Sequence, residues 1–367
     1  MSFFSEYKNV QNLLKQKQEI VFYAESRHYF QYYGQLIHDL LETGKVSVTY
    51  ITSDKNDPLF NSQWKNFRVV HVKWLLGFLF SKIQSSVMIM TMPDLGNYLF
   101  KRSAGVDSYI YMFHAAVSTH QQYRQHAFDN YDAIFCTGDY QQKEIRKAEE
   151  LYKLKPKEII EYGYPLFDKL NGLKKTSTEK TILIAPSWYS EGILNTCFEE
   201  LIKELSKLPY QIIIRSHPEY EKRDKKKFEQ IKKMISQLSN IKIDTLASVS
   251  ERLPSSDILV TDRSGIAFEF AFGIGKPVLF IDTPLKINNP DYKELNIEPV
   301  ENYLRNDLGV SIAPDNLGII PERINSLLAN NENFAVKMEK MKSELFYNSP
   351  ASYKAGLEYV LSKLRKD

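Results

Sequence analysis

Short apolar runs rich in β-branched and aromatic residues alternate with longer amphipathic stretches along the whole chain. The runs cover residues 19–24, 46–51, 67–72, 86–92, 108–114 and 132–137, and then 181–187, 210–217, 240–245, 257–262 and 276–282. Near-continuous apolar strands separated by helices are typical of parallel sheets that are covered on both faces. The pattern therefore predicts an α/β protein.

The alternation is interrupted by one polar stretch, "NGLKKTSTEK" (171–180), which divides the chain into two similar halves. We place the domain boundary there and predict two Rossmann-like domains, over residues 1–172 and 173–345. The amphipathic segment 346–367 is expected to form a helix that packs back on the first domain. Two open α/β domains predict a cleft between them, where ligands bind at the carboxyl ends of the parallel strands.

Composition and charge narrow the class of protein. The 48 basic and 45 acidic residues of the 367-residue chain leave a net charge of +3, which argues against nucleic acid as the main partner. Cys136 and Cys197 have neither the number nor the spacing of a disulfide framework or a metal site. Reduced thiols and an N-terminal segment unlike a signal peptide indicate a cytoplasmic protein.

Contact with a membrane surface is the one open question about location. The segment "VKWLLGFLFSKI" (72–83) is too short to cross a bilayer, so it predicts either a buried helix or an interfacial patch. The patch would consist of Trp74, Leu75, Phe78 and Leu79. Basic stretches at 174–180 and 221–233 are either solvated surfaces or weak attractors of anionic lipid.

Polar residues that follow the predicted strands are the candidates for chemistry. His114 ends one strand, where a histidine facing the cleft could serve as a general base, or could instead cap a helix or lie in the core. Arg215 and His217 end another strand, before Pro218, and the pair suits a diphosphate. An ordinary polar loop is the alternative for that segment.

The stretch "VTDRSGIAFEFA" (260–271) runs from a strand through a polar turn into a helix. We expect Asp262 or Ser264 to cap that helix and Gly265 to allow close approach, so that exposed amides form an anion site. Glu269 would present its carboxylate to a ribose, although plain capping with Glu269 in solvent is the alternative. Pro186 and Ser187 in "ILIAPSW" end another strand, where the turn could hold backbone near the same ligand.

In order along the chain, "MFHAA", "YGYPLFDKL", "ILIAPSW", "IRSHP" and "SSDILVTDRSGIAFEFAFGIGKPVLF" resemble the motifs of the CDP-glycerol glycerophosphotransferase family, the teichoic-acid polymerases and primases. The resemblance covers residues 108–345 and implies two domains of the GT-B kind. The chain departs from the family pattern at several positions. Ala115 replaces a glycine, Arg263 a tyrosine, Gly265 a serine, Glu269 an aspartate, and Leu166–Phe167 an Arg-Asn pair.

The resemblance also implies roles for individual residues. His114 would take a proton from the acceptor hydroxyl, while His217 and Arg215 would contact the diphosphate of the nucleotide donor and stabilise the leaving phosphate. Ser264 would bind phosphate, and Glu269 would bind the ribose. The nucleotide-binding set is completed by Asp262, Arg263, Gly265, Pro186 and Ser187. Neither a metal nor a cofactor is expected, because cationic side chains and the start of the helix neutralise the phosphates.

The function that the resemblance implies is transfer of glycerol phosphate or ribitol phosphate from a CDP-activated donor. The acceptor would be a hydroxyl of a surface polysaccharide or a lipid-linked glycan, in teichoic acid, capsule or O-antigen biosynthesis beside the inner face of the cytoplasmic membrane. A glycosyltransferase that uses a nucleotide sugar needs the same anion site and stays an alternative. A nucleotide-sugar 2-epimerase and a non-catalytic nucleotide-binding protein are further alternatives.

Overall fold

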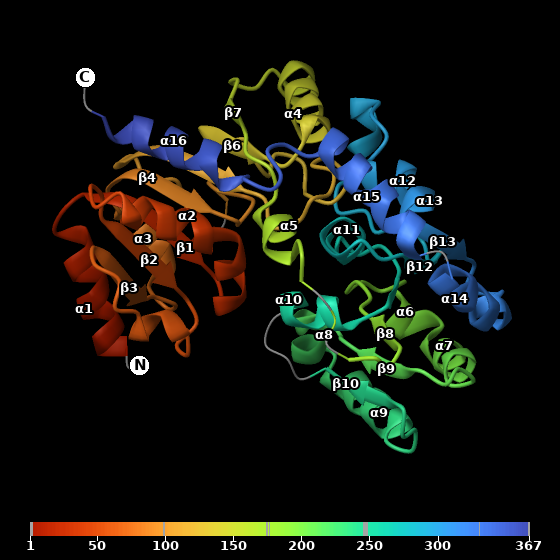
Figure 1. Ribbon diagram of the computed structural model, residues 1–367. Helices are drawn as coiled ribbons and strands as arrows, with labels where there is room; N and C mark the ends of the chain where they lie inside the picture. The colour runs from red at the N-terminus through yellow and green to blue at the C-terminus, as the bar shows by residue number, and fades with distance from the viewer. Residues whose placement is uncertain are drawn as a thin grey trace.

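Two parallel sheets, each flanked by helices, form two domains in a computed structural model of the chain (Figure 1). The structure describes residues 3–97, 100–173, 175, 177–244, 249–329 and 331–365. The all-parallel pairing confirms the predicted α/β class, because every paired strand in these ranges runs parallel to its neighbour.

The first sheet has seven strands in the described residues, in the order β3-β2-β1-β4-β5-β6-β7. Its strands are β1 (Gln18–Ala24), β2 (Val48–Thr52), β3 (Phe67–His71), β4 (Ser85–Met90), β5 (Val106–Met112), β6 (Ala133–Cys136) and β7 (Glu158–Glu161). The helices that accompany it are α1 (Phe3–Leu14), η1 (Arg27–Tyr29), α2 (Phe30–Glu42), η2 (Pro58–Asn61), α3 (Leu76–Lys82) and α4 (Asp139–Tyr152).

The second sheet has six strands in the described residues, in the order β10-β9-β8-β11-β12-β13. Its strands are β8 (Thr181–Ile184), β9 (Gln211–Ile214), β10 (Ile241–Ile243), β11 (Ile258–Thr261), β12 (Val278–Ile281) and β13 (Gly309–Ile312). The helices from the end of the first domain onward are α5 (Pro165–Leu170), α6 (Ile193–Thr196), α7 (Phe198–Leu205), α8 (Pro218–Arg223), α9 (Lys225–Ile235), α10 (Val249–Arg252), η3 (Leu253–Ser255), α11 (Ile266–Phe268), η4 (Glu269–Ile274), η5 (Tyr292–Leu295), α12 (Val300–Tyr303), α13 (Arg305–Leu308), η6 (Leu317–Ile319), α14 (Ile320–Ala329), α15 (Asn331–Leu345) and α16 (Tyr353–Leu364).

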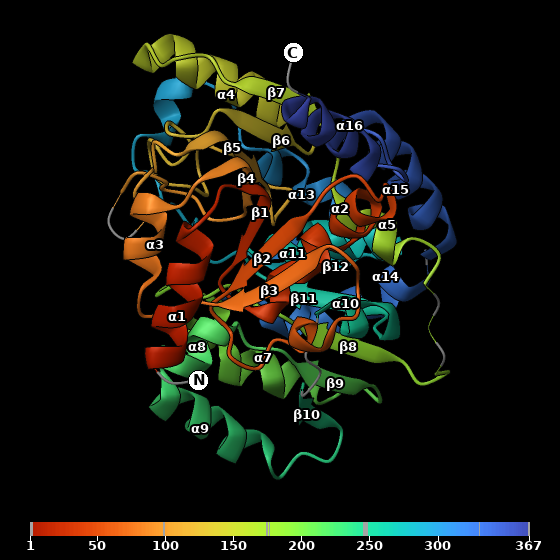
Figure 2. The same cartoon turned by 90° about the vertical axis from the view of Figure 1, so that its left-hand side faces the viewer.

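Each sheet buries both faces, as the apolar strand sequences require. In the first domain, α1 and α3 cover one face and α2 the other (Figure 2). In the second domain, α7, α9 and α14 pack on one face through residues such as Leu201, Phe228 and Ile324, while α11 and η4 cover the opposite face. The predicted core residues Phe268, Phe270 and Phe272 lie in this buried layer.

The two domains share one apolar core around α5. Phe167 in α5 lies 6.0 Å from Phe272 and 4.8 Å from Phe346, measured between ring centroids, and Phe272 and Phe346 lie 5.1 Å apart. Leu166 beside them is also fully buried. The Leu166–Phe167 pair, which departs from the family's Arg-Asn, therefore packs in the core that joins the domains.

The chain returns to the first domain at its C-terminal end. The segment predicted as a helix over 346–367 contains α16, which contacts α2, β4 and β7 (Figure 1). Asp168 in α5 anchors the crossing, because its carboxylate accepts hydrogen bonds from the backbone N–H of Ser352 at 3.0 Å and from the Ser352 hydroxyl. The crossing ties the end of the chain to the element that joins the domains.

Candidate active site

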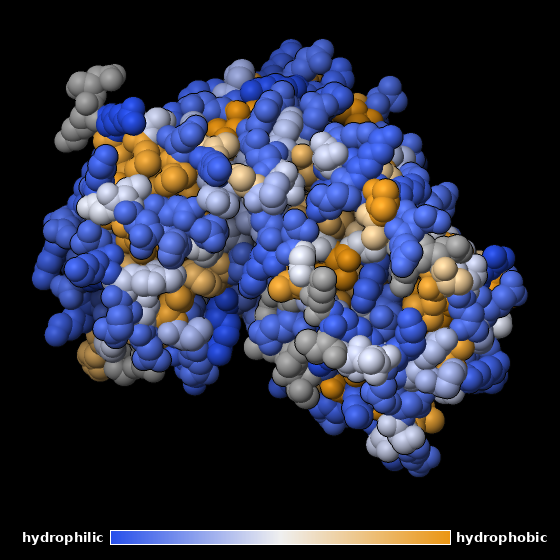
Figure 3. All heavy atoms as spheres, in the orientation of Figure 1, coloured by the Kyte–Doolittle hydropathy of each residue, from blue (hydrophilic) through white to orange (hydrophobic). Residues whose placement is uncertain are grey.

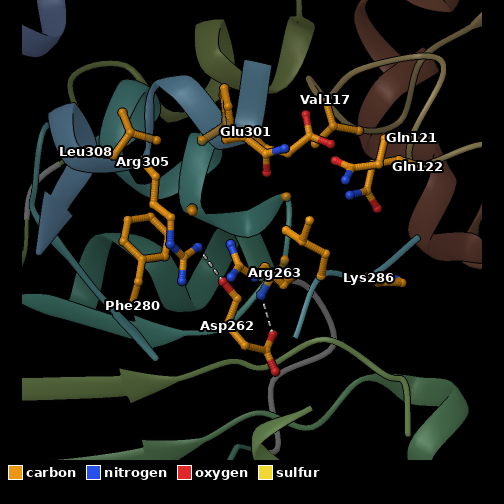
Figure 4. Close-up of a pocket in the computed structure, with 16 residues that line it drawn as sticks. Val117, Gln121, Gln122, Asp262, Arg263, Phe280, Lys286, Glu301, Arg305 and Leu308 are labelled. Carbon is orange, nitrogen blue, oxygen red and sulfur yellow. Dashed lines mark hydrogen bonds between the residues drawn. The ribbon is translucent and has the colours of Figure 1, made fainter. Parts of the chain in front are cut away.

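The space between the two domains is lined by residues that follow strands of both sheets. Figure 3 shows the domains as two lobes separated by a notch. A cavity of about 410 Å³ lies between them, and Figure 4 shows side chains that line it. The lining residues come from the segment after β5 and from the segments after β11 and β12, and they include Val117, Gln121, Gln122, Asp262, Arg263, Ser264, Gly265, Lys286, Glu301 and Arg305.

His114 lies just beyond the end of β5 and is set up as a proton acceptor. Its Nδ1 atom lies 3.1 Å from the carbonyl oxygen of Thr91, and because a carbonyl can only accept, Nδ1 carries the proton and Nε2 keeps its lone pair. Burial is the main cause that lowers the pKa of His114 to about 4; the charges of His217 and Lys286 act in the same direction, and the hydrogen bond with Thr91 opposes them. The imidazole is therefore neutral at pH 7, as a general base must be.

Gly265 brings the segment after β5 against the start of the helix after β11. A Cβ atom placed on Gly265 would lie 3.1 Å from Val117 Cγ1 and 3.6 Å from Ala115 Cβ. Ala115 and Gly265, which follow His114 and Ser264 in the sequence, therefore lie against each other across the domain boundary. Ala115 and Gly265 are two of the departures from the family pattern, and their contact suggests that the larger residue on one side accompanies the smaller one on the other.

The expected cap at the helix start is wrong. Gly265 is the N-cap of α11, with no side-chain cap, and the helix continues directly into the π-helical turns of η4. The carboxylate of Asp262 instead accepts hydrogen bonds from the backbone N–H of Ser187 (2.7 Å), Ile193 (3.1 Å) and Arg263 (2.7 Å). These three amides, and not those at the start of the helix, donate the hydrogen bonds to this carboxylate. Within the described residues the Ser264 hydroxyl makes no hydrogen bond, which leaves it for a ligand.

Asp262 therefore organises the loop that carries two other predicted residues. Its bond to the Ser187 amide holds the buried Pro186–Ser187 turn against the end of β11. Arg305 also holds this segment in place, because its Nη1 atom donates a hydrogen bond to the backbone carbonyl oxygen of Asp262 at 2.8 Å (Figure 4). Pro186 and Ser187 thus lie beside the cavity as part of its supporting turn.

Arg215 and His217 follow β9. Asp244, whose side chain is fully buried, accepts from Arg215 Nη1 at 2.6 Å and from Arg252 Nη2 at 2.8 Å, so one carboxylate orients two guanidinium groups. His217 is exposed and stacks on Trp188 with 6.4 Å between ring centroids and 22° between ring planes. The charge of His217 also contributes to the lowered pKa of His114.

Glu269 is buried at the junction of the domains. Tyr164 Oη lies 2.8 Å from Glu269 Oε1 and 3.0 Å from the carbonyl oxygen of His114. Burial raises the pKa of Glu269 to about 7, although the hydrogen bond from Tyr164 and the charge of Arg215 both oppose the rise. The alternative that placed Glu269 in solvent is wrong, and its ribose-binding role stays a prediction.

Three charged residues that line the cavity were absent from the predicted set. Lys286 follows β12, while Glu301 and Arg305 lie in the short helices α12 and α13. Glu301 accepts hydrogen bonds from the Ser118 backbone N–H and hydroxyl at 3.0 and 2.9 Å, which links the two domains. None of the three belongs to a recognisable motif, so only the folded chain brings them to the cavity.

In the described ranges, no three His, Cys, Asp or Glu side chains are grouped so that they could hold a metal ion. Cys136 is buried, Cys197 is half-buried, and both are free thiols. Among the helices that the structure describes, none has the length and apolar character needed to span a bilayer. The expectation that the chemistry needs no metal stays a prediction.

The comparison with known families decides the classification. The family model described as CDP-Glycerol:Poly(glycerophosphate) glycerophosphotransferase matches residues 6–289, which is most of the chain. The chain belongs to this family. The match begins about a hundred residues before the first motif of the resemblance, so the family likeness includes β1 to β4 as well as the site.

Two curated relatives of this family member come from Bacillus subtilis (strain 168). The chain is 26% identical to the teichoic acid glycerol-phosphate primase over 175 residues, which are 44% of this chain and 42% of the primase. It is 27% identical to the minor teichoic acid biosynthesis protein GgaB over 190 residues, which are 41% of this chain and 19% of GgaB. The matched part is therefore less than half the length of either relative.

Solved structures confirm the GT-B fold of the family member. A structure of the wall teichoic acid polymerase TagF, soaked with CDPG, superposes with a TM-score of 0.63 at 16% identity and covers 98% of this chain and 93% of TagF. A putative UDP-N-acetylglucosamine 2-epimerase from Listeria monocytogenes gives a TM-score of 0.56 at 13% identity, with 93% of this chain and 94% of that protein covered. At these identities the likeness shows the fold alone.

Proposed function

We propose that the protein transfers a polyol phosphate, glycerol phosphate or ribitol phosphate, from a CDP-activated donor to a hydroxyl of a surface polysaccharide or lipid-linked glycan. Membership of the glycerophosphotransferase family supports the reaction class. The observation that carries the proposal is the neutral His114, whose Nδ1 is held by the Thr91 carbonyl so that Nε2 keeps its lone pair. Teichoic acid, capsule and O-antigen synthesis are the processes that need such a transfer.

The proposed step is an in-line displacement at phosphorus. The acceptor hydroxyl gives its proton to His114 Nε2 while its oxygen forms a bond to the phosphorus nearer the polyol. The bond between that phosphorus and the bridging oxygen breaks, and CMP leaves with the electron pair. The arrangement of the cleft would supply positioning, and preorganised cations and amides would stabilise the charge that develops on the phosphate oxygens.

The residues around the cavity would hold the nucleotide donor during this step. Arg215 and His217 would contact its diphosphate, and His217 would stabilise the leaving phosphate. Ser264, the Gly265 amide and Arg263 would bind phosphate at the helix start. Asp262, Pro186 and Ser187 would shape the turn beneath, and Glu269 would approach the ribose.

A screen of nucleotide donors tests the proposal. Purified protein is incubated with CDP-glycerol, CDP-ribitol and UDP-sugars together with lipid-linked glycan acceptors, and released CMP, UMP and UDP are measured. CMP release that depends on both a CDP-polyol and an acceptor is the expected result. UDP release from a sugar donor would instead identify a glycosyltransferase, and interconversion of a UDP-sugar without acceptor would identify an epimerase.

We also propose that the protein works at an anionic membrane surface through an aromatic patch on α1 and α3. The patch comprises Phe3, Phe4, Tyr7, Trp74 and Phe78, of which Phe4 and Trp74 are 83% and 76% exposed. The two helices contact each other, and the exposed Lys8, Lys73 and Lys82 surround the patch. Exposed aromatic side chains with neighbouring lysines suit the headgroup region of anionic bilayers.

The fold divides the segment 72–83 between buried and exposed side chains, and the interfacial alternative stays a prediction for the exposed ones. Leu79 is buried in the core, whereas Trp74 and Phe78 are exposed. In a sedimentation assay, phosphatidylglycerol vesicles should bind the wild-type protein but not the Trp74→Ser variant. The control is Tyr303→Ser, which removes an aromatic ring that is 42% exposed from the other domain. Equal retention of all three proteins would refute the patch.

A further inference from the structure

Lys286 lies in the segment after β12 and lines the cavity between the domains (Figure 4). Its side chain is half-buried, and burial lowers its pKa, with the charge of Asp262 acting in the opposite sense. Within the described residues, neither a carboxylate nor any other acceptor lies close enough to pair with its ammonium group. A half-buried ammonium group without an acceptor is costly unless an anion or water satisfies it.

The other cations of the cavity already have protein partners. Arg263 donates to the carbonyl oxygen of Thr283 from Nε and Nη2, at 3.1 and 2.9 Å. Arg305 is buried, and it donates to Asp282 Oδ1 at 2.9 Å and to the Asp262 carbonyl at 2.8 Å. These guanidinium groups hold loops in place. Lys286 is the cation of the cavity whose donors remain available in the described part of the chain.

The acidic groups of the cavity do not serve Lys286 either. The Asp262 carboxylate is saturated by three backbone amides, and the Glu301 carboxylate is held by Ser118. Burial also raises the pKa of Glu301. A ligand that brings its own negative charge is therefore the natural partner of Lys286.

Lys286 is also near enough to His114 for its charge to lower the pKa of the imidazole. The two side chains come from different domains, Lys286 from the second and His114 from the first. A group held by Lys286 in the cavity would therefore lie within electrostatic reach of the proposed base. In the proposed reaction, the group at that position is the phosphate that moves to the acceptor.

We propose that Lys286 is a catalytic residue that binds an oxygen of the transferred phosphate. This inference rests on the proposed polyol-phosphate transfer and adds a residue outside the motifs that define the site. An ammonium group suits this role because its three donors can follow the phosphate oxygens as they rearrange. Before the donor binds, burial keeps His114 unprotonated and the charge of Lys286 adds to this effect. Once bound, the phosphate neutralises Lys286 and makes His114 a stronger base.

Steady-state kinetics of Lys286→Met and Lys286→Arg test the contact with phosphate, with CDP-glycerol or whichever CDP-polyol supports turnover as the donor. We expect kcat of Lys286→Met to fall roughly 100-fold, the usual effect of losing one preorganised charge partner in the transition state, while Lys286→Arg retains part of the activity. Lys293→Met is the matched control, since Lys293 is an exposed lysine of the same segment. A Lys286→Met protein with kcat within twofold of wild type would overturn the assignment.

A second readout needs no turnover and follows His114 directly. In protein with ¹³C-labelled histidine, the His114 resonance is assigned with the His114→Gln variant and titrated by NMR. We expect the pKa of His114 to rise in Lys286→Met and to stay unchanged in Lys293→Met. An unchanged value in Lys286→Met would show that the two side chains do not interact. If the wild-type protein turns over no CDP-polyol, both the proposed function and the role of Lys286 at the phosphate fail. The NMR titration would still show whether the charge of Lys286 affects the pKa of His114.

Discussion

Replacing Glu269 with glutamine should stabilise the protein above neutral pH. Tyr164 has one hydroxyl proton but two acceptors within reach, the His114 carbonyl and the Glu269 carboxylate. Both are satisfied only when Glu269 is protonated, because its O–H can then donate to Tyr164 while Tyr164 donates to His114. An ionised Glu269 loses that arrangement inside the protein. Glutamine keeps a donor and an acceptor at this position and carries no charge.

The magnitude follows from the pKa of Glu269, which burial raises from 4.5 to about 7. At 1.36 kcal/mol per pKa unit, this difference corresponds to about 3 kcal/mol. Since the folded state binds the proton more tightly than the unfolded chain, this stabilisation is complete below about pH 4.5 and is lost as the pH rises through 7. The Glu269→Gln variant has no such loss, so its advantage over wild type should reach up to about 3 kcal/mol at pH 8.

Urea denaturation at pH 5 and pH 8 provides the assay. We expect the free energies of unfolding of wild type and Glu269→Gln to differ by less than about 1 kcal/mol at pH 5, the scale of one altered hydrogen bond, and to diverge at pH 8. The control is Glu150→Gln, whose side chain is 73% exposed and should change little at either pH. A Glu269→Gln protein that is destabilised equally at both pH values would refute the reasoning.

Three further predictions concern the cleft. Gly265→Ser should lower stability by about 1–3 kcal/mol through overpacking against the other domain, and Ala115→Gly in the same protein should restore part of it; a thermal double-mutant cycle with no coupling would contradict this. Asp244→Asn should release Arg215 and weaken CDP binding roughly tenfold in calorimetry, the scale of one charged hydrogen bond, whereas unchanged affinity would exclude the positioning role. The acid limb of the pH profile of kcat/KM should lie near pH 4, where His114 of the free protein titrates. The acid limb of kcat should lie at higher pH, because a bound anionic donor raises the pKa of His114. Acid limbs at the same pH would argue against His114 as the base.

The sequence analysis predicted the fold where burial determines the sequence. Strands such as Ile258–Thr261 are buried on both faces, so they must be apolar throughout, and that pattern is visible without a structure. Two edge strands were missed. The strand β7 (Glu158–Glu161) begins and ends with exposed glutamates, and β13 (Gly309–Ile312) is only partly buried. At an edge, backbone pairing does not require an apolar sequence, so the signal is weak.

Residues of the candidate site could be proposed from the sequence where a strand end carries a motif. Residues whose partners are set by the tertiary fold could not be identified in this way. His114 and Ser264 belong to such motifs, and the fold brings their sequence neighbours together. Asp262 was expected to cap a helix, but two of the three amides that it binds, those of Ser187 and Ile193, belong to a loop 75 and 69 residues earlier. Lys286 belongs to no motif, and its importance follows from what its neighbours already bind. Hydrogen-bond partners that are distant in the sequence leave no local pattern from which they could be predicted.

The central claim is that His114 removes the proton of an acceptor hydroxyl while a CDP-polyol is held across the cleft. The most direct measurement compares CMP release and CDP-glycerol affinity for wild type and His114→Gln. The account predicts that CMP release falls at least about 100-fold, the scale of general base catalysis, while the affinity for the nucleotide donor changes little. A His114→Gln protein that releases CMP at the wild-type rate would contradict it.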